Sequence, residues 1–391
     1  MSALIERLQA LIRIPSPNPS GDTRAIAAYI ADVMRAAGCR VTTAAPDSKP
    51  EAVSVIATIG QGDPVIMLHA HIDTVPIDAN EALRWSSDPY AAEIRDGRIY
   101  GKGSIDDKAP LAAMMETMIA VAHHGEALKG TLVLAAAAEE EVGGRLGTRW
   151  LADHGYLPMC DFIIVGEQTH NHVATAHKGV LRATIRTTGR SVHATNPDRG
   201  INAITAMASI VLALDAYHHN LSGQRHPLVG VPTCNVGVIH GGSTANAVPD
   251  SCAIAIDRRM IPGENPALVQ QELIAAVSAV DIAPAEATVG DFLVSDWFSS
   301  TVDTPLAQLF MGIVSETLAI VPNPIGYLPG SDAKHLRGVL RGEMIIFGPG
   351  SYEVAHAYDE YAEIAELEAT AHILGRFIDQ VLITRQTHHD V

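Results

Sequence analysis

The spacing of hydrophobic positions predicts that helices and strands alternate along the first part of the chain. Apolar residues recur every three to four positions where helices are expected, and form short continuous runs where buried strands are expected. The expected helices span 2–12 and 23–38, and a third begins near Asp106 and ends near 121. The expected strands span 40–43, 54–59, 65–70, 130–138 and 161–165, and Asp96 and Gly97 add a hairpin signal. This alternation indicates an α/β fold in which helices flank a central sheet.

The pattern changes at about residue 177 and changes back at about 291. In between, the expected order is strand, helix, strand, strand, helix, strand, which is typical of a compact α+β unit of the ferredoxin-like kind. These elements span 181–188, 202–216, 231–239, 252–258, 266–280 and 283–289. Alternation then resumes with a helix at 304–319, a strand at 344–347 and a final helix at 361–383. We therefore predict one discontinuous domain, 1–176 with 292–391, and one inserted domain, 177–291.

Composition narrows the classes of partner and site. A chain of 391 residues exceeds what one hydrophobic core usually supports, which agrees with two domains. Its formal net charge of −17 argues against a nucleic acid or an anionic membrane as partner. The four cysteines are scattered without a Cys-x-x-Cys pair, so a disulfide framework or a thiolate zinc site is not expected. No basic leader and no apolar run of about 18 residues is found, and a cytoplasmic location is the expectation.

The candidate chemistry begins where the strand expected at 65–70 ends in polar residues. His69, His71 and Asp73 alternate there, so their side chains are expected on the same face. A metal-bound imidazole needs its second ring nitrogen held, usually by a carboxylate, and Asp73 is spaced to do this for His71. Taken alone, a His-x-Asp sequence is more typical of a hydrogen-bonded pair at a strand end than of a metal site.

Further acidic residues follow other strands. Glu139, Glu140 and Glu141 come directly after the apolar run 130–138, and Glu167 follows the run 161–165. Ligands in open α/β sheets bind outside the carboxyl ends of the strands, so these acids are expected near the residues that follow 65–70. Adjacent carboxylates raise each other's pKa, so a run of acidic residues is costly to bury unless it is exposed to water or paired with cations. A solvated acidic loop is the alternative, and the strand-end setting favours a site.

Eight short motifs, in their order along the chain, make the protein similar to a known family. Each motif alone is a weak signal, but together they cover nearly the whole chain. They resemble those of the M20 family of metallopeptidases and deacylases, which includes deacetylases, desuccinylases, aminoacylases and carboxypeptidases. The motifs occupy 71–76, 101–108, 139–143, 166–167, 191–194, 246–249, 257–264 and 355–356.

The resemblance implies a zinc-exopeptidase-like catalytic domain that binds two divalent metal ions. One ion would be bound by His71 and Glu167 and the other by Glu141 and His356, with Asp106 as the bridge. Nitrogen and carboxylate donors without thiolates suit a catalytic site, with Zn²⁺ as the first expectation and Co²⁺ or Mn²⁺ as alternatives.

The resemblance also implies roles for residues that do not bind the metals. Glu140 would be the general base, and Asp73 would keep the role in orienting His71 that its spacing suggests. The inserted domain would be a lid that also forms a homodimer, and His193 would reach the active site of the partner subunit. Asn246 and Arg259 would contact the substrate, Arg259 through a carboxylate, which its planar guanidinium matches. Without the resemblance, His193 would be read as an ordinary half-buried residue and Arg259 as a solvated or interface charge.

The implied activity is metal-dependent hydrolysis of the amide bond of an N-acyl-amino acid, with an acyl group of the acetyl or succinyl type. A dipeptidase or carboxypeptidase with the same site is the alternative. A protein that binds metal or peptide without turnover is less favoured, because Glu140 and Asp106 are both present. Two departures from the family pattern, Gln168 in place of a frequent Pro and Ala109 in place of a frequent Gly, leave the subfamily open.

Overall fold

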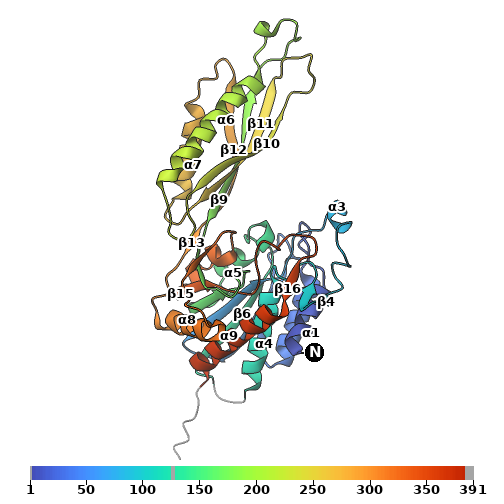
Figure 1. Cartoon of the computed structure of the whole chain (residues 1–391), viewed down its shortest axis with the longest axis vertical. Helices are drawn as coiled ribbons and strands as arrows, with labels where there is room; N and C mark the ends of the chain where they lie inside the picture. The colour runs from blue at the N-terminus through green and yellow to red at the C-terminus, as the bar shows by residue number, and fades with distance from the viewer. Residues whose placement is uncertain (1, 125–127, 384–391) are drawn as a thin grey trace, which may run out of the picture. The chain divides into compact units, whose positions relative to one another are not determined.

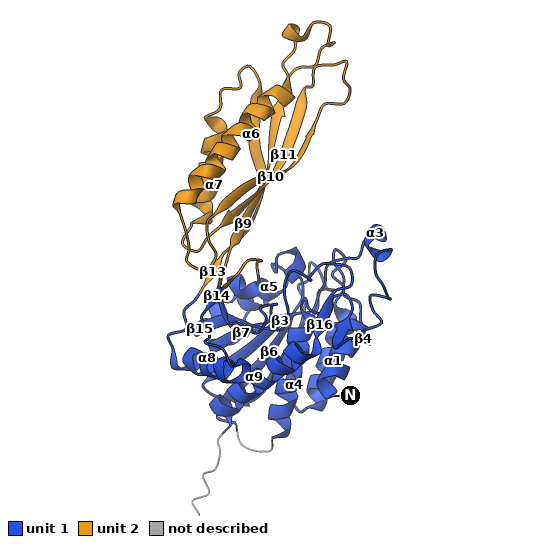
Figure 2. Ribbon diagram, viewed as in Figure 1, with its two compact units in different colours: residues 1–175, 300–325, 331–391 blue, residues 176–299, 326–330 orange. Residues whose placement is uncertain are grey.

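The computed structural model describes residues 2–124 and 128–383, and the chain divides into two compact units (Figure 1, Figure 2). Unit 1, blue in Figure 2, comprises Met1–Thr175, Ser300–Ile325 and Ser331–Val391. Unit 2, orange in Figure 2, comprises Ala176–Ser299 and Gly326–Gly330.

The largest sheet is mixed and has nine strands, in the order β1-β2-β6-β3-β7-β15-β8-β13 with β14 paired to β8. Strand β3 runs parallel to both of its neighbours, β6 and β7. Strand β2 runs antiparallel to both of its neighbours, β1 and β6. The strands are β1 (Arg40–Ala44), β2 (Ser54–Gln61), β3 (Val65–His71), β6 (Gly130–Ala137), β7 (Cys160–Val165), β8 (Ala174–His177), β13 (Phe298–Ser299), β14 (Ile325–Tyr327) and β15 (Leu340–Ile346).

The central strands are continuous apolar runs because both of their faces are covered. Every residue of β3 and β6 is buried. The aromatic rings of Phe162, Phe310 and Phe377 meet at centroid distances between 5.1 and 6.3 Å, which joins β7 to the helices packed on the sheet. The helices of unit 1 are α1 (Ala3–Ile12), α2 (Arg24–Ala36), α3 (Ala79–Ala82), α4 (Lys108–His123), α5 (Thr148–Asp153), α8 (Pro305–Leu318) and α9 (Ile364–Leu382).

A small three-stranded sheet confirms one prediction and corrects another. The hairpin predicted at Asp96 and Gly97 joins β4 (Glu93–Arg95) to β5 (Arg98–Tyr100). The start of the predicted final helix was wrong, because Tyr361–Glu363 forms strand β16 and α9 begins at Ile364. Strand β16 pairs with β5, far away in the sequence, and local apolar spacing carries no signal of such a pairing.

Unit 2 contains a four-stranded antiparallel sheet in the order β10-β11-β9-β12. Buried and less buried residues alternate along β9 and β11, and the buried side chains pack in one cluster with residues of the two helices. The order strand, helix, strand, strand, helix, strand agrees with the sequence pattern. The elements are β9 (Gly179–Thr188), α6 (Ala203–Asn220), β10 (Thr233–Gly241), β11 (Ser251–Met260), α7 (Pro266–Ser278) and β12 (Glu286–Ser295).

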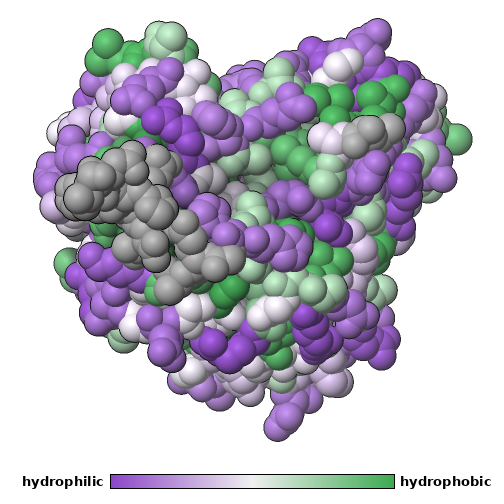
Figure 3. All heavy atoms as spheres, turned by 90° about the horizontal axis from the view of Figure 1, so that it is seen from below, coloured by the Kyte–Doolittle hydropathy of each residue, from purple (hydrophilic) through white to green (hydrophobic). Residues whose placement is uncertain are grey.

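The fold class predicted from the sequence is confirmed, since a mixed central sheet is flanked by helices (Figure 1). Hydrophilic residues cover most of the face shown in Figure 3, with smaller hydrophobic areas among them. Within the described ranges, no helix combines the length and the apolar character that crossing a bilayer requires.

Candidate metal centre

The carboxyl ends of three adjacent strands bring the candidate residues together. Because β3 is parallel to β6 and β7, these three strands end at the same edge of the sheet. His71 is the last residue of β3, Glu140 follows β6 in a short 3₁₀ turn, and Glu167 lies just beyond β7. This is the edge at which open α/β sheets bind their ligands.

Two groups of potential metal ligands share Asp106. One group is His71, Asp106 and Glu167, and the other is Asp106, Glu141 and His356. Within each group, the possible ligand atoms lie within 4.8 Å of one another. His71 Nε2 is 2.9 Å from Asp106 Oδ1, whereas His356 Nε2 is 3.1 Å from Asp106 Oδ2. The two oxygens of one carboxylate thus face two different histidines.

The charges of these groups favour a bound cation. Burial and the neighbouring carboxylates Asp107 and Asp106 raise the pKa of Glu167 well above its usual value. Burial and Asp106 likewise raise the pKa of Glu141 to about 8. Hydrogen bonds to Asp106 and Glu141 raise the pKa of His356 to about 10. Several carboxylates are therefore held together against their mutual repulsion, and imidazole and carboxylate donors without thiolates fit divalent metal ions such as zinc.

Asp73 contacts both the histidine and the glutamate turn. His71 Nδ1 lies 3.0 Å from the backbone carbonyl oxygen of Asp73 and 3.6 Å from its carboxylate oxygen Oδ1. The carboxylate accepts hydrogen bonds from the backbone N–H groups of Glu140 and Glu141, each at 3.1 Å, and from the Asn18 amide at 2.6 Å. The Asp73 backbone makes the shorter contact to His71, and its carboxylate fixes the start of the turn that carries Glu140.

Glu140 belongs to neither ligand group and contacts a lysine instead. Lys334 Nζ lies 3.1 Å from Glu140 Oε1 and also donates to the backbone carbonyl of Ser331 at 2.9 Å. Only 14% of the Glu140 side chain and 3% of the Lys334 side chain are exposed, so this ion pair is largely shielded from water. Burial opposes the charged form of Lys334, yet Glu140 and Asp332 raise its pKa.

The sequence analysis assigned no role at the site to three residues, of which two contact the ligand groups and one contacts Glu140. Gln168 Nε2 lies 3.0 Å from Asp106 Oδ1 and 3.3 Å from Glu167 Oε2. Glu360 accepts hydrogen bonds from the backbone N–H groups of Gly103, Ile105 and Asp106, and thereby holds the loop that carries the shared carboxylate. Lys334, which contacts Glu140, is the third of these residues. The departure from the family pattern at Gln168 was the one available signal.

Two other acidic or histidine candidates lie outside both groups. Glu139 is buried and forms an ion pair with the partly exposed Lys49, with Nζ 2.6 Å from Oε1. His69 is buried, and its Nε2 lies 2.7 Å from the hydroxyl oxygen of Thr148. Each contact supplies a polar partner for a side chain, Glu139 or His69, that is buried at this edge of the sheet.

The remaining predicted site residues lie in unit 2. Arg259, in β11, forms an ion pair with Asp257 in which Nε and Oδ1 are 2.6 Å apart. The backbone carbonyl of Asn246 accepts a hydrogen bond from Ala194, and His193 forms an isolated bridge with Ala247. His193 and Asn246 therefore sit on neighbouring segments.

Comparison with solved structures shows the same fold. A metallo-carboxypeptidase of the M20 family from Sulfolobus solfataricus superposes with a TM-score of 0.79 at 18% identity, covering 97% of this chain and 99% of that one. A dinuclear metal-binding peptidase of the M20 family from Bacillus subtilis superposes with a TM-score of 0.68 at 16% identity, covering 97% of both chains.

Sequence comparison identifies the family. The acetylornithine deacetylase of Photorhabdus laumondii is 30% identical over 337 residues, which cover 85% of this chain and 83% of that protein. The model of the peptidase family M20/M25/M40 matches residues 67–380. The chain belongs to the M20 peptidase family, as its eight motifs predicted.

Proposed function

We propose that this hydrolase removes an acyl group, of the acetyl or succinyl type, from an N-acyl-amino acid. The observation that carries the proposal is the Asp106 carboxylate, whose two oxygens face His71 and His356 while Glu140 stands just beyond the second ligand group. The similarity to acetylornithine deacetylase supports an acylated amino acid as the substrate class. We also propose a cytoplasmic location, where the four buried, free cysteines would stay reduced.

The proposed ligand sets follow the two groups. His71 and Glu167 would hold one divalent ion, Glu141 and His356 the other, and Asp106 would bridge them, with Zn²⁺ preferred over Co²⁺ or Mn²⁺. When bound, two such ions polarise a carbonyl and lower the pKa of water. Glu140 would accept the proton of the attacking water and pass it to the departing amine. The contacts with Lys334 and with Asp73 would keep Glu140 in place.

His193 would stabilise the oxyanion that forms during attack. Its Nδ1 accepts a hydrogen bond from the backbone N–H of Thr195 at 3.2 Å and lies 2.9 Å from the Thr195 hydroxyl oxygen, and the N–H contact favours the tautomer that carries its proton on Nε2. That N–H is a donor of the kind that an oxyanion needs. Asn246 and Arg259 would contact the substrate, with Arg259 binding its carboxylate through the guanidinium N–H groups that Asp257 leaves free.

We further propose that unit 2 acts as a lid and joins two copies of the chain, so that His193 serves the active site of the partner. Strand β10 is at one edge of its sheet, where backbone groups can pair with another chain. Val238 and Ile239 in β10 and Leu212 in α6 are exposed apolar residues, which a second copy would cover.

A dipeptidase or carboxypeptidase activity is the second candidate. The Sulfolobus protein, whose fold is similar over nearly the whole chain, is a metallo-carboxypeptidase. Both activities cleave an amide bond, so the same carboxylates and histidines would serve either one. A binding protein without turnover is disfavoured, since Asp106 and Glu140 are both in place.

Amine release from a substrate panel tests the proposal. The panel contains N-acetyl, N-succinyl and longer N-acyl amino acids together with dipeptides, assayed with Zn²⁺ or Co²⁺ and with a chelated control. Metal-dependent release from acyl substrates is the expected result. Release from dipeptides alone would favour the second candidate, and no release by protein shown to hold two metal ions per chain would contradict both.

A further inference from the structure

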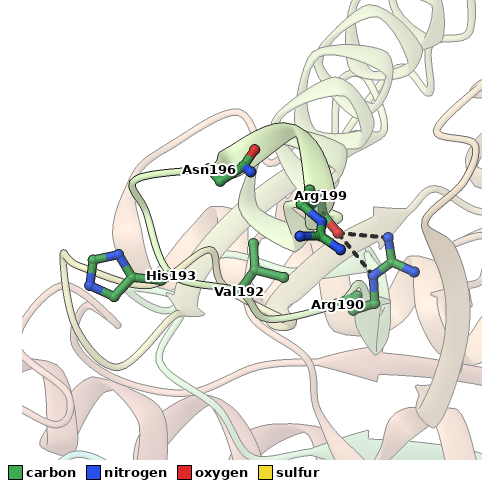
Figure 4. A pocket seen from close by; sticks show the side chains of 5 residues that line it. All are labelled: Arg190, Val192, His193, Asn196 and Arg199. Carbon is green, nitrogen blue, oxygen red and sulfur yellow. Dashed lines mark hydrogen bonds between the residues drawn. The ribbon is translucent and has the colours of Figure 1, made fainter.

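A pocket of about 560 Å³ in unit 2 is formed by the segment that connects β9 to α6 (Figure 4). It is lined by Arg190, Val192, His193, Asn196 and Arg199. Of these described lining residues, two carry a guanidinium group and none is acidic. Two positive charges in one pocket are unexpected in a chain whose formal net charge is −17.

No carboxylate of the described residues pairs with either arginine. Arg190 donates from Nε and Nη2 to the backbone carbonyl of Arg199, at 3.2 and 2.7 Å (Figure 4). This contact fixes the position of the Arg190 guanidinium but leaves its charge unbalanced. Within the described part of the chain, neither Arg190 nor Arg199 forms an ion pair, so no carboxylate balances either guanidinium charge.

The other polar groups of the pocket can also donate. The Thr195 N–H donates to His193 Nδ1, and this contact favours the tautomer that carries a proton on Nε2. The Asn196 amide offers two further N–H groups. A pocket that supplies guanidinium, imidazole and amide donors, and no carboxylate, suits an anion.

The pocket is held open by the backbone. Arg190 and Ile201 exchange two backbone hydrogen bonds of 2.9 Å, and Val248 donates to the carbonyl of Val192 at 2.8 Å. Gly189 permits this close approach, because a Cβ at that position would lie 2.1 Å from the carbonyl oxygen of Ile201. The backbone of Arg190 and Val192 is therefore fixed, and the Arg190 guanidinium is held by its hydrogen bonds to Arg199, so this donor is positioned before any ligand arrives, which lowers the entropic cost of binding.

We propose that this pocket binds an oxyanion, either a carboxylate or a phosphate, with Arg199 as the principal charged contact and Arg190 and Asn196 as additional donors. Two sources of such a group are chemically equivalent here: a carboxylate on the acyl part of the substrate, or a free phosphate ion. The first source rests on the proposed function, whereas the second does not.

Calorimetric titration of the metal-loaded full-length protein with inorganic phosphate tests the binding itself. Arg199→Gln removes the charge from an exposed side chain and should weaken phosphate binding about tenfold or more, the effect of losing a charge-assisted hydrogen bond. Arg225→Gln, an exposed arginine of unit 2 outside the pocket, is the matched control and should bind like the wild type. Phosphate bound at the metals contributes equally to all three proteins. Equal binding by wild type and Arg199→Gln would overturn the proposal.

The ratio of kcat/KM for N-succinyl and N-acetyl derivatives of one amino acid identifies the source of the anion. If the substrate supplies the carboxylate, Arg199→Gln lowers this ratio about tenfold through a higher KM for the succinyl substrate. If free phosphate is the ligand, the ratio stays at the wild-type value although phosphate binding is weakened. The titration needs no turnover, so inactivity on the whole panel would count against the proposed function and leave the test of the pocket intact.

Discussion

Glu140 stands out among the residues of the site because it is close to both ligand groups and belongs to neither. A general base needs this position, in which its carboxylate is free of the metals and held by other contacts. We expect Glu140→Ala to keep the bound metal and to lose about 10²–10⁴ of kcat, since only proton transfer is removed. Metal content and turnover are measured on the same preparation, with exposed Glu368→Ala as control. Turnover near the wild-type value would refute the assignment.

Gln168 lies within reach of the proposed ligands, at a position where the sequence analysis expects a departure from the family pattern. Its amide donates toward both Asp106 and Glu167, so it aligns two carboxylates that would otherwise repel each other. We expect Gln168→Ala to weaken metal binding about 10- to 100-fold, as is usual when a hydrogen-bond partner of a ligand is removed.

The measurement for Gln168 is a competition titration with a chromophoric chelator, which reports the metal dissociation constant without turnover. Gln224→Ala, an exposed glutamine of unit 2, is the control. An unchanged dissociation constant in Gln168→Ala would show that the amide has no part in aligning the carboxylates.

For single residues, the sequence indicated which side chains are potential metal ligands, but it did not indicate which residues contact them. All members of the two ligand groups were named beforehand, because strand ends and short motifs mark them. Lys334 and Glu360 were not named beforehand. Lys334 is 194 positions away from Glu140 in the sequence, and Glu360 is about 255 positions away from the backbone groups that it binds. No periodicity or spacing encodes a side-chain contact over such a separation.

For helices and strands, the local sequence pattern was sufficient to predict those strands whose residues are all buried. The strands β3 and β6 were predicted from their apolar runs to within two residues. Strand β16 was missed because a three-residue strand is defined by its partner β5 and not by its own sequence. The sequence also predicted that the polar residues following these strands lie close together, because parallel strands end at the same edge of a sheet.

One carboxylate in β15 anchors the start of α8, and its effect on stability should depend on pH. Glu343 accepts hydrogen bonds from the hydroxyl groups of Thr301 and Thr304 and from the N–H groups of Asp303 and Thr304. Burial opposes ionisation of Glu343, but these hydrogen bonds outweigh it and lower the pKa. A lowered folded-state pKa contributes stability that is present above the unfolded value of about 4.5 and lost as the pH falls below it.

Glu343→Gln should therefore lower the free energy of unfolding by about 1–3 kcal/mol at pH 7, because an amide cannot accept all of these hydrogen bonds. The difference from the wild type should shrink as the pH falls below about 4.5, where the wild-type carboxylate becomes protonated. Urea unfolding at a series of pH values measures it, and exposed Glu368→Gln should show no such effect. A difference that is constant with pH would contradict this account.

For the whole molecule, we expect the buried carboxylates to couple metal binding to folding. Without a cation, Asp106, Glu141 and Glu167 repel one another, and a divalent ion that binds only the folded chain adds about 2.7 kcal/mol at one hundred times its dissociation constant. We expect chelation to lower the midpoint of thermal unfolding by on the order of 5 °C, and Zn²⁺ or Co²⁺ to restore it. Calorimetry with and without chelator measures the shift. A midpoint that is independent of metal would argue against a folded-state site.

The proposed homodimer makes the most demanding prediction, because it places parts of one active site on two chains. His193→Ala and Glu140→Ala should each be inactive alone, but a mixed dimer combines the intact Glu140 of one chain with the intact His193 of the other. After full exchange of equal amounts, half of the dimers are mixed and one of their two sites is complete, so activity should recover to about a quarter of the wild-type value.

Mixing His193→Ala with a chain that carries both substitutions is the control, since no chain in that mixture supplies His193. Native mass spectrometry of the mixtures verifies that subunits have exchanged. If exchange is complete and the first mixture remains as inactive as the control, His193 does not serve the partner's site. Recovery in the first mixture alone would instead mean that the metal-binding unit of one chain works with the α+β unit of another, and that the assembled dimer is the catalytic unit.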